Sequence, residues 1–339
     1  MNERNRTAAT DRPLHEEYDT ALLDLDGVVY AGGHAIPHAV DALNEARAGR
    51  MHLAFVTNNA SRTPQTVADH LTRLGIDAAP GDVITSAQAV ARLVADRFPP
   101  GSRVLVVGGE GLRAAVREQG LEEVDSADDE PVAVLQGYDP DVGWRRLAEV
   151  SYAVSRGVPW FASNTDLTIP TARGTAPGNG ALVEAVRAAT GADPEVAGKP
   201  LPPMHRETIL RTGARRPLVV GDRLDTDIEG ADAGGVDSLL VLTGVTGPAG
   251  LLAAPPRQRP TYVARDLRGL LAAQPRVDTF EDGFRCGGWT AAVRGGEATL
   301  DGSGDPADGL RALCAAVWTA ADAGSTGTET AKALARLGF

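Results

Sequence analysis

Residues 21–33, ALLDLDGVVYAGG, decide how this chain folds. An apolar run ends in two aspartates, Asp24 and Asp26, directly before Gly27. A continuous apolar run is typical of a buried strand in a parallel sheet. Ligands of such sheets bind at the carboxyl ends of the strands. We therefore expect the two aspartates to mark a reaction centre, with Gly27 giving the chain room to turn away from it.

Short apolar runs alternate with helical spacing along most of the chain, which is typical of βαβ units and mainly parallel sheets. The sequence predicts strands at residues 21–25, 53–57, 103–107, 132–136, 160–163, 218–220 and 238–242. It predicts helices at residues 38–48, 64–74, 87–98, 143–155, 181–189 and 203–212. The fold class is therefore α/β.

Breaker-rich passages divide the chain into domains. Two of them, near residues 79–86 and 190–203, enclose enough chain for an inserted α/β cap domain at 85–191. The parallel-sheet core is then expected to consist of residues 18–84 and 192–272. Residues 273–339 are expected to form a small α+β appendage with two short strands, and residues 1–17 a polar tail.

Composition limits the possible partners. The formal net charge of −12 argues against nucleic acid, whose backbone requires clustered Lys and Arg. No apolar stretch has the length of a signal peptide core or a membrane span. The two cysteines, Cys286 and Cys314, are expected to be reduced thiols. We expect a cytoplasmic protein without a nucleic-acid or membrane partner; the sequence does not indicate its oligomeric state.

Polar residues of particular kinds also follow other predicted strands. Thr57 and Asn58 follow the second strand, Asp222 and Asp227 follow the strand at 218–220, and Lys199 lies in the second breaker-rich passage. If these strand ends meet, converging carboxylates require a cation, and an oxygen-only ligand set favours Mg²⁺. A carboxylate, Mg²⁺ and a lysine together suit attack on a phosphoryl group.

Four ordered segments resemble the motifs of the haloacid dehalogenase superfamily of phosphatases: DLDGVVY (24–30), VTNNASR (56–62), AGKP (197–200) and VVGDRLDTDIEGADAGG (219–235). The residues in these motifs are similar to those of the branch that includes nitrophenyl-phosphatases, pyridoxal-phosphate phosphatase and phosphoglycolate phosphatase. That branch has a Rossmann-like core with a large inserted α/β cap. Within it, the chain most resembles actinobacterial proteins assigned as glycerol-3-phosphate phosphatases.

The resemblance implies a role for each motif residue. Asp24 is the nucleophile and a metal ligand, and Asp26 is the general acid and base, with its backbone carbonyl on Mg²⁺. Asp222 is the third metal ligand. Asp227 supports the site from outside the metal's own ligands, through a metal-bound water or Lys199.

The other residues act on the phosphate. Thr57 and Asn58 bind the phosphoryl oxygens, and Lys199 neutralises charge at the nucleophile. The expected substrate is a small phosphorylated metabolite, with glycerol 3-phosphate as the best candidate and phosphoglycolate or pyridoxal phosphate as the alternative. A phosphotransferase and a non-catalytic phosphate sensor stay open as other functions.

A second glycine-rich segment offers a different interpretation. Gly109, Gly111 and Ala114 follow a predicted strand with the spacing of a dinucleotide-binding fingerprint. They lie inside the predicted cap, and no second Rossmann half follows. We favour a tight strand-to-helix turn.

Overall fold

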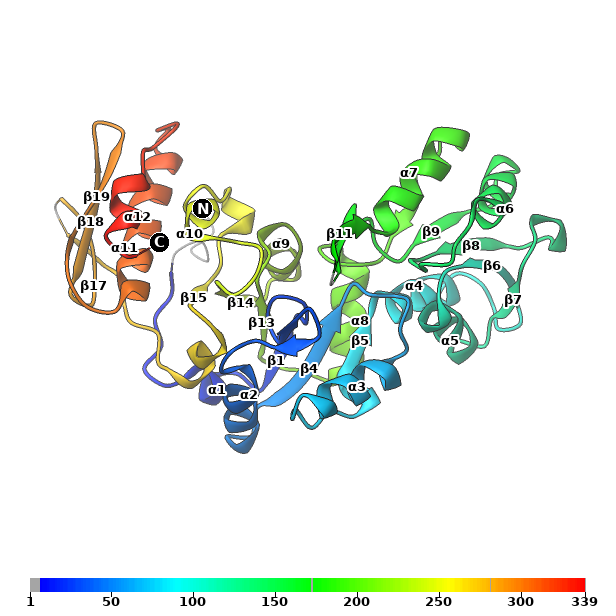
Figure 1. The fold of residues 1–339 in the computed structure, drawn as a ribbon, viewed down its shortest axis with the longest axis horizontal. Coiled ribbons are helices and arrows are strands. Elements are labelled where there is room, and N and C mark those ends of the chain that lie inside the picture. Colours follow the sequence, from blue (N-terminus) through cyan, green and yellow to red (C-terminus); the bar gives the residue numbers. More distant parts are fainter. Residues whose placement is uncertain (1–6, 172, 281, 339) are drawn as a thin grey trace. The chain divides into compact units, whose positions relative to one another are not determined.

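The computed structural model describes residues 7–171, 173–280 and 282–338 (Figure 1). The chain divides into two compact units, one formed by Met1–Leu53 and Ala214–Phe339 and the other by Ala54–Gly213. The division falls within strand β4 (His52–Thr57). The α/β class with parallel sheets is confirmed in each unit.

The first unit contains four parallel strands in the order β15-β14-β13-β1. All four residues of β1 are buried, as the continuous apolar run predicts. Three of these strands lie within one or two residues of the predicted ends, whereas β15 was not predicted. Their bounds are β1 (Thr20–Leu23), β13 (Pro217–Gly221), β14 (Asp237–Val241) and β15 (Tyr262–Ala264).

Helices and short turns connect these strands. The helices are α1 (Leu14–Glu17), α2 (Ala39–Ala48), α9 (Glu229–Gly234) and α10 (Pro248–Leu252). A π-helical turn, η4 (Leu224–Ile228), follows β13, and 3₁₀ turns occur at η5 (Pro256–Gln258) and η6 (Leu267–Leu271). Two short strands, β2 (Tyr30–Ala31) and β3 (His34–Ala35), form a hairpin after β1.

The N-terminal segment lies along this unit from residue 7 onward. Ala8 N donates to Thr261 O at 3.0 Å, and Thr10 N donates to Gln274 O at 3.0 Å. Leu14, in α1, is fully buried. The part of the predicted polar tail that the structure describes is therefore bonded to the unit, while residues 1–6 lie outside the described residues.

The C-terminal module (β16 to α12) is a four-stranded antiparallel sheet with two helices. We predicted two strands, and four form because Gly295 and Gly296, at φ +58° and +84°, turn β18 back into β19. Helix α11 packs on β17 and β18. The elements are β16 (Asp278–Phe280), β17 (Gly283–Cys286), β18 (Trp289–Arg294), β19 (Glu297–Gly302), α11 (Pro306–Asp322) and α12 (Ala331–Ala335).

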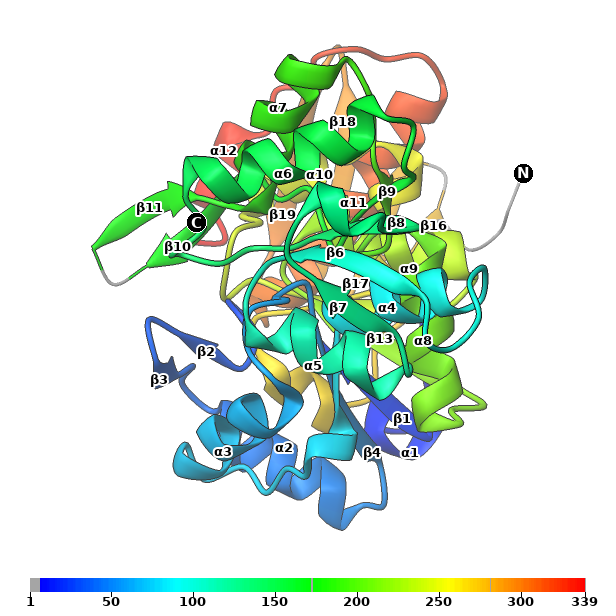
Figure 2. The same cartoon turned by 90° about the vertical axis from the view of Figure 1, so that its right-hand side faces the viewer.

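The second unit pairs β4 with β5 (Val83–Thr85) and contains a separate five-stranded parallel sheet in the order β12-β9-β8-β6-β7. A hairpin, β10 (Thr168–Thr171) with β11 (Gly174–Pro177), follows β9 (Figure 2). The sheet strands are β6 (Arg103–Val107), β7 (Glu122–Val124), β8 (Ala133–Gln136), β9 (Trp160–Ala162) and β12 (Glu195–Val196). The cap boundaries at residues 85 and 191 stay a prediction.

Six helices lie in the described part of this unit; five of them are close to predicted positions, and α5 was not predicted. Helix α4 begins one residue earlier than predicted because Thr85 and Gln88 form a capping box at its start. The helices are α3 (Pro64–Arg73), α4 (Ser86–Ala95), α5 (Glu110–Glu118), α6 (Trp144–Ser155), α7 (Asn179–Thr190) and α8 (Pro202–Thr212), with 3₁₀ turns η2 (Pro80–Asp82) and η3 (Ala127–Asp129).

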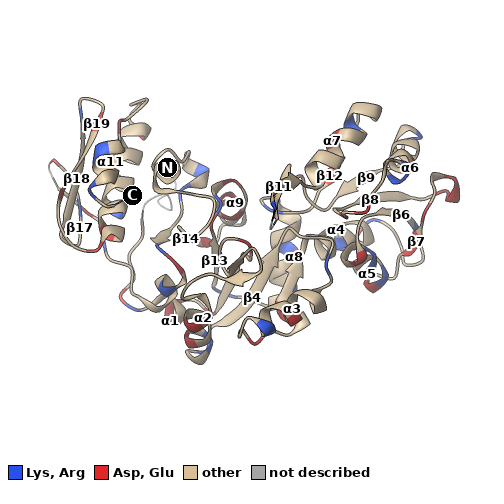
Figure 3. Ribbon diagram, in the orientation of Figure 1, with Lys and Arg blue, Asp and Glu red and all other residues tan. Residues whose placement is uncertain are grey.

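Charged residues of both signs occur in the same helices, as in α3 and α5 (Figure 3). Among the described residues, none of the helices has the length and apolar character needed to cross a bilayer.

Candidate active site

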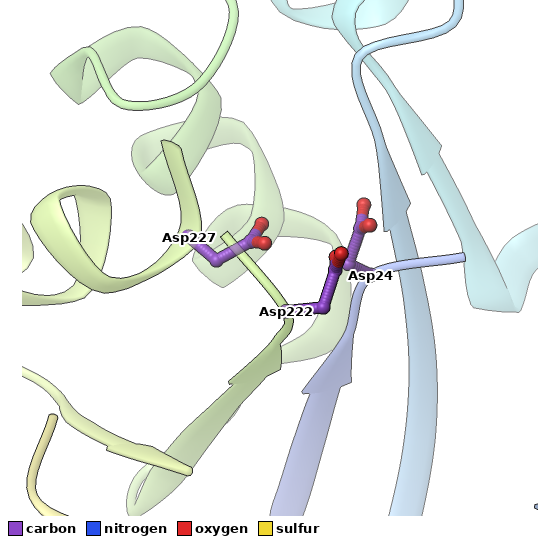
Figure 4. A group of neighbouring side chains, drawn as sticks. All are labelled: Asp24, Asp222 and Asp227. Carbon is purple, nitrogen blue, oxygen red and sulfur yellow. The ribbon is translucent and has the colours of Figure 1, made fainter. Parts of the chain in front are cut away.

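Three carboxylates of the first unit come together at the carboxyl ends of adjacent strands. Asp24 directly follows β1, Asp222 directly follows β13, and Asp227 lies in η4. Their ligand atoms all lie within 4.8 Å of one another, and Figure 4 shows them facing a common space. Asp24 N also donates to Val220 O at 2.8 Å, which extends the β1–β13 pairing to the aspartate.

The loop after β14 encloses Asp222. The Asp222 side chain is fully buried, and its Oδ2 accepts a hydrogen bond from Val245 N at 2.6 Å. Thr246 N donates to Asp222 O at 3.1 Å. A Cβ atom at Gly244 would lie 1.9 Å from Asp222 Oδ2. This loop was not predicted as part of the site, although a Thr-Gly pair, Thr243 and Gly244, follows the strand predicted at 238–242.

Gly27 makes the turn that brings the first motif close to Asp222. Its φ of +86° favours glycine, and a Cβ there would lie 2.6 Å from Asp222 Oδ2. Gly27 O accepts from Thr243 Oγ1 at 2.6 Å, and Gly27 N donates to Tyr30 O at 2.9 Å. Asp26 lies beside this turn, is exposed, and does not belong to the group of three carboxylates described above.

Asp227 is held from its own turn. It is buried, and its Oδ2 accepts from Arg223 N at 3.2 Å. A Cβ at Gly221 would lie 2.2 Å from Asp227 Cβ, so the end of β13 approaches Asp227 too closely for a side chain. The neighbouring Asp225 has a different environment: its hydrogen bonds from the Arg223 guanidinium lower the pKa of its carboxyl group.

Asn58 of the second unit is held by Lys199 and Asp166. Its Nδ2 donates to Asp166 Oδ2 at 3.1 Å and to Lys199 O at 3.3 Å, while its Oδ1 accepts from Lys199 N at 2.8 Å. Lys199 Nζ donates to Val56 O at 3.1 Å. Thr57, at the end of β4, is buried, and its Oγ1 accepts from Asn59 N at 3.1 Å. The structure thus brings Thr57, Asn58 and Lys199 together.

The segment that follows β9 completes this arrangement. Asn164 Nδ2 donates to Asn58 O at 2.8 Å, and Ser86 Oγ donates to the same oxygen at 2.6 Å. A Cβ at Gly198 would lie 2.7 Å from Asn58 Oδ1, so a side chain there would displace the Asn58 amide. The sequence analysis assigned no role to Asn164 or Asp166, although both lie at a strand end.

Backbone atoms of Ser61 and Arg62 pack closely against the glycine-rich turn after β6. A Cβ at Gly109 would lie 2.9 Å from Ser61 Cα, and one at Gly111 would lie 2.3 Å from Arg62 O. Gly111 N donates to Ser61 O at 3.0 Å. The backbone at Ser61 and Arg62 therefore accounts for these glycines as close packing, which favours the tight turn over a dinucleotide site.

Family models match both parts of the predicted core. Residues 21–122 match the haloacid dehalogenase-like hydrolase model, and residues 196–270 match a second model described as HAD-hydrolase-like. Residues 286–339 match a GCN5-related N-acetyltransferase like domain.

Curated relatives and solved structures agree with these matches. The chain is 45% identical over 324 residues to D-glycerol 3-phosphate phosphatase from Mycobacterium tuberculosis, covering 91% of this chain and 88% of that protein. It is 37% identical over 254 residues to acid sugar phosphatase from Staphylococcus haemolyticus, covering 74% of this chain and 95% of that protein.

The solved structures include glycerol phosphate phosphatase from Mycobacterium tuberculosis in complex with magnesium. It has a TM-score of 0.84 and 44% identity, and the match covers 91% of this chain and 92% of that one. A p-nitrophenyl phosphatase from Archaeoglobus fulgidus has a TM-score of 0.69 and 29% identity, with 75% and 98% covered.

Proposed function

This chain belongs to the haloacid dehalogenase-like hydrolase family, and we propose that it is a Mg²⁺-dependent phosphatase of small phosphate monoesters, with glycerol 3-phosphate as its substrate. The observation that carries the chemistry is the group formed by Asp24, Asp222 and Asp227, whose ligand atoms lie within 4.8 Å of one another. The substrate rests on the relative that shares 45% of its residues with this chain and acts, by its name, on D-glycerol 3-phosphate.

The donor set fits magnesium. Three carboxylates this close repel one another, and oxygen ligands are those that Mg²⁺ prefers. In our proposal, the side chains of Asp24 and Asp222 and the backbone carbonyl of Asp26 hold the ion, and Asp227 orients the site from outside its ligands. When bound, Mg²⁺ offsets the charge of both the nucleophile and the phosphate.

Asp24 is the proposed nucleophile. Its carboxylate oxygen attacks the phosphorus atom, and the bond between phosphorus and the ester oxygen breaks while Asp26 donates a proton to the departing alcohol. An aspartyl-phosphate on Asp24 results. Asp26 then takes a proton from water, the water oxygen attacks phosphorus, and the release of inorganic phosphate restores Asp24.

The phosphate-binding groups in this proposal are those that the family motifs imply. Thr57 Oγ1 and the backbone N–H of Asn58 donate to the non-bridging oxygens, and Lys199 neutralises charge. The side-chain amide of Asn58 already bonds to Asp166 and Lys199, so we assign it to holding Lys199 rather than to the phosphate.

The test uses the purified full-length chain. Phosphate release from glycerol 3-phosphate, phosphoglycolate, pyridoxal phosphate and p-nitrophenyl phosphate is measured with MgCl₂ and with EDTA. We expect glycerol 3-phosphate to give the highest kcat/KM and EDTA to abolish turnover. Asp24→Asn should lose at least about a thousandfold in kcat because it removes the nucleophile. Full activity in a folded Asp24→Asn variant would reject the mechanism, and binding without turnover in the wild type would indicate a sensor.

A further inference from the structure

Helix α10 connects the loop around Asp222 to the C-terminal module. The loop at residues 243–247 holds Asp222 through Val245 N and holds Gly27 through Thr243 Oγ1. Pro248, the first residue of α10, follows this loop directly. Leu251 N donates to Gly247 O at 3.0 Å, so the helix and the end of the loop share a hydrogen bond. The loop thus runs directly into the first turn of α10.

Helix α11 of the C-terminal module fixes α10. Leu251 and Leu252 are buried in one apolar cluster with residues of α11, including Leu313, Val317 and Trp318. Trp318 Nε1 donates a hydrogen bond to Leu251 O at 3.2 Å. This acceptor is in the last turn of α10 and also accepts from Ala254 N at 3.1 Å, so Trp318 adds a side-chain donor from α11 to a carbonyl that already has one backbone partner.

The buried side chain of Arg259 packs against Trp318 and holds it in this position. The guanidinium carbon of Arg259 lies 5.4 Å from the centre of the Trp318 ring. Arg259 also donates to Asp322 Oδ2, in α11, at 2.8 Å and to Ala254 O, two residues after α10, at 3.2 Å. The same guanidinium thus joins α11 to the chain that leaves α10, and Trp318 lies between them.

The turn η4, which contains Asp227, packs on the same apolar cluster. Ile228 directly follows Asp227 and is a buried member of the cluster, and Leu224 packs against it. A second buried arginine, Arg311 of α11, donates to Val263 O, in β15, at 2.6 Å and to Gln274 Oε1 at 2.8 Å. The C-terminal module therefore packs on α10, which follows the Asp222 loop, and on the residues on either side of Asp227.

We propose that the C-terminal module positions the cation ligands of the hydrolase core, with Trp318 as the residue that fixes α10 and, through α10, the backbone N–H donor to Asp222. The inference depends on the proposed function only for the identity of the ion. It assigns to the module a positioning role in cation binding and no separate catalytic activity.

The test compares two tryptophan-to-phenylalanine variants of the full chain. Trp318→Phe keeps an aromatic ring over Arg259 and removes the donor from α11 to Leu251 O, while the backbone donor Ala254 N stays. Trp289→Phe removes an indole N–H from the same cluster, where the described residues provide it with no hydrogen-bond acceptor. The second variant therefore controls for the loss of ring area and for general loosening of the module.

Binding is measured with Mn²⁺ as the only added ligand. The concentration of free Mn²⁺ is obtained from its electron paramagnetic resonance signal. Trp318→Phe should weaken Mn²⁺ binding about fivefold, the effect of about one lost hydrogen bond, and Trp289→Phe should leave it unchanged. Hydrogen exchange should become faster at the amide of Val245 in Trp318→Phe and not in Trp289→Phe. Neither measurement requires turnover, so an inactive wild type would reject the proposed function while leaving this test valid.

Two outcomes would overturn the inference: wild-type Mn²⁺ affinity in folded Trp318→Phe, or equal weakening in both variants. If Trp318→Phe fails to fold, Asp322→Asn replaces it, because it loosens Arg259 through a half-exposed ion pair. That variant should weaken Mn²⁺ binding about twofold, in line with the small contribution of such pairs. Unchanged affinity and unchanged exchange at Val245 in Asp322→Asn would equally overturn the inference.

Discussion

Replacing Gly244 by alanine tests whether the loop after β14 fixes Asp222. The added Cβ would lie 1.9 Å from Asp222 Oδ2, about 1.5 Å short of the 3.4 Å at which ordinary contact begins. Asp222 is fully buried, and Val245 N holds the same oxygen at 2.6 Å, so the carboxylate has little room to retreat. A shift of about 1 Å in a catalytic group costs on the order of a hundredfold in rate.

We therefore expect Gly244→Ala to lower kcat/KM for glycerol 3-phosphate about a hundredfold and to raise the Mg²⁺ concentration needed for half-maximal rate. Gly247→Ala, in the same loop, is the matched control because a Cβ at Gly247 would meet no atom within 4 Å. Circular dichroism and thermal unfolding establish that both variants fold. Wild-type kcat/KM in folded Gly244→Ala would refute the reasoning, and so would equal losses in the two variants.

Three further predictions concern single side chains. Magnesium at about a hundred times its Kd should stabilise the wild type by about 2.7 kcal/mol relative to EDTA, and Asp222→Asn should lose most of this gain in calorimetry; an equal gain in both would contradict the ligand assignment. Asp166→Asn should lower kcat about tenfold with little change in KM, because Asn58 loses a charged acceptor and holds Lys199 less firmly; unchanged steady-state kinetics would contradict this. Burial lowers the pKa of His205 below its usual 6.5, so the stability that neutral His205 contributes is present above that pH and is lost as pH falls below it. His205→Gln should flatten the fall in urea stability between about pH 7.5 and about pH 5.5, and an identical fall in both proteins would contradict the assignment.

The sequence predicted those parts of the fold whose burial is continuous along the chain. Strand β6 occupies the predicted residues 103–107 because Val104 to Val107 are buried on both faces of the sheet. The three-residue strands β5 and β15 were missed, whereas β9, which is equally short, was predicted at 160–163, so a run of this length has no period that identifies it reliably. The β10–β11 hairpin was missed because its strands are largely polar and contain proline.

The group of carboxylates in the candidate site was predictable because its members are charged side chains at strand ends. Asp24 and Asp222 were identifiable because charges at the ends of buried strands are unusual. Val245 was not, since it acts through a backbone N–H that every residue except proline possesses. Trp318 was not identifiable either, because its role depends on Leu251, far away in the sequence, and no local pattern records such a contact.

The acids after β13 show how the fold assigns different roles to one residue type. Asp222 and Asp227 are buried, and each accepts a backbone N–H, which orients the carboxylate without neutralising its charge. Asp225 is exposed and pairs with the Arg223 guanidinium at 2.8 Å, so its charge is already compensated by a cation of the protein. A divalent cation gains most from carboxylates that are fixed by neutral donors. We therefore expect this segment to offer Asp222 and Asp227 to a cation and to leave Asp225 on the surface. The distinction follows from the group that donates to each carboxylate rather than from the position of the residue in the sequence.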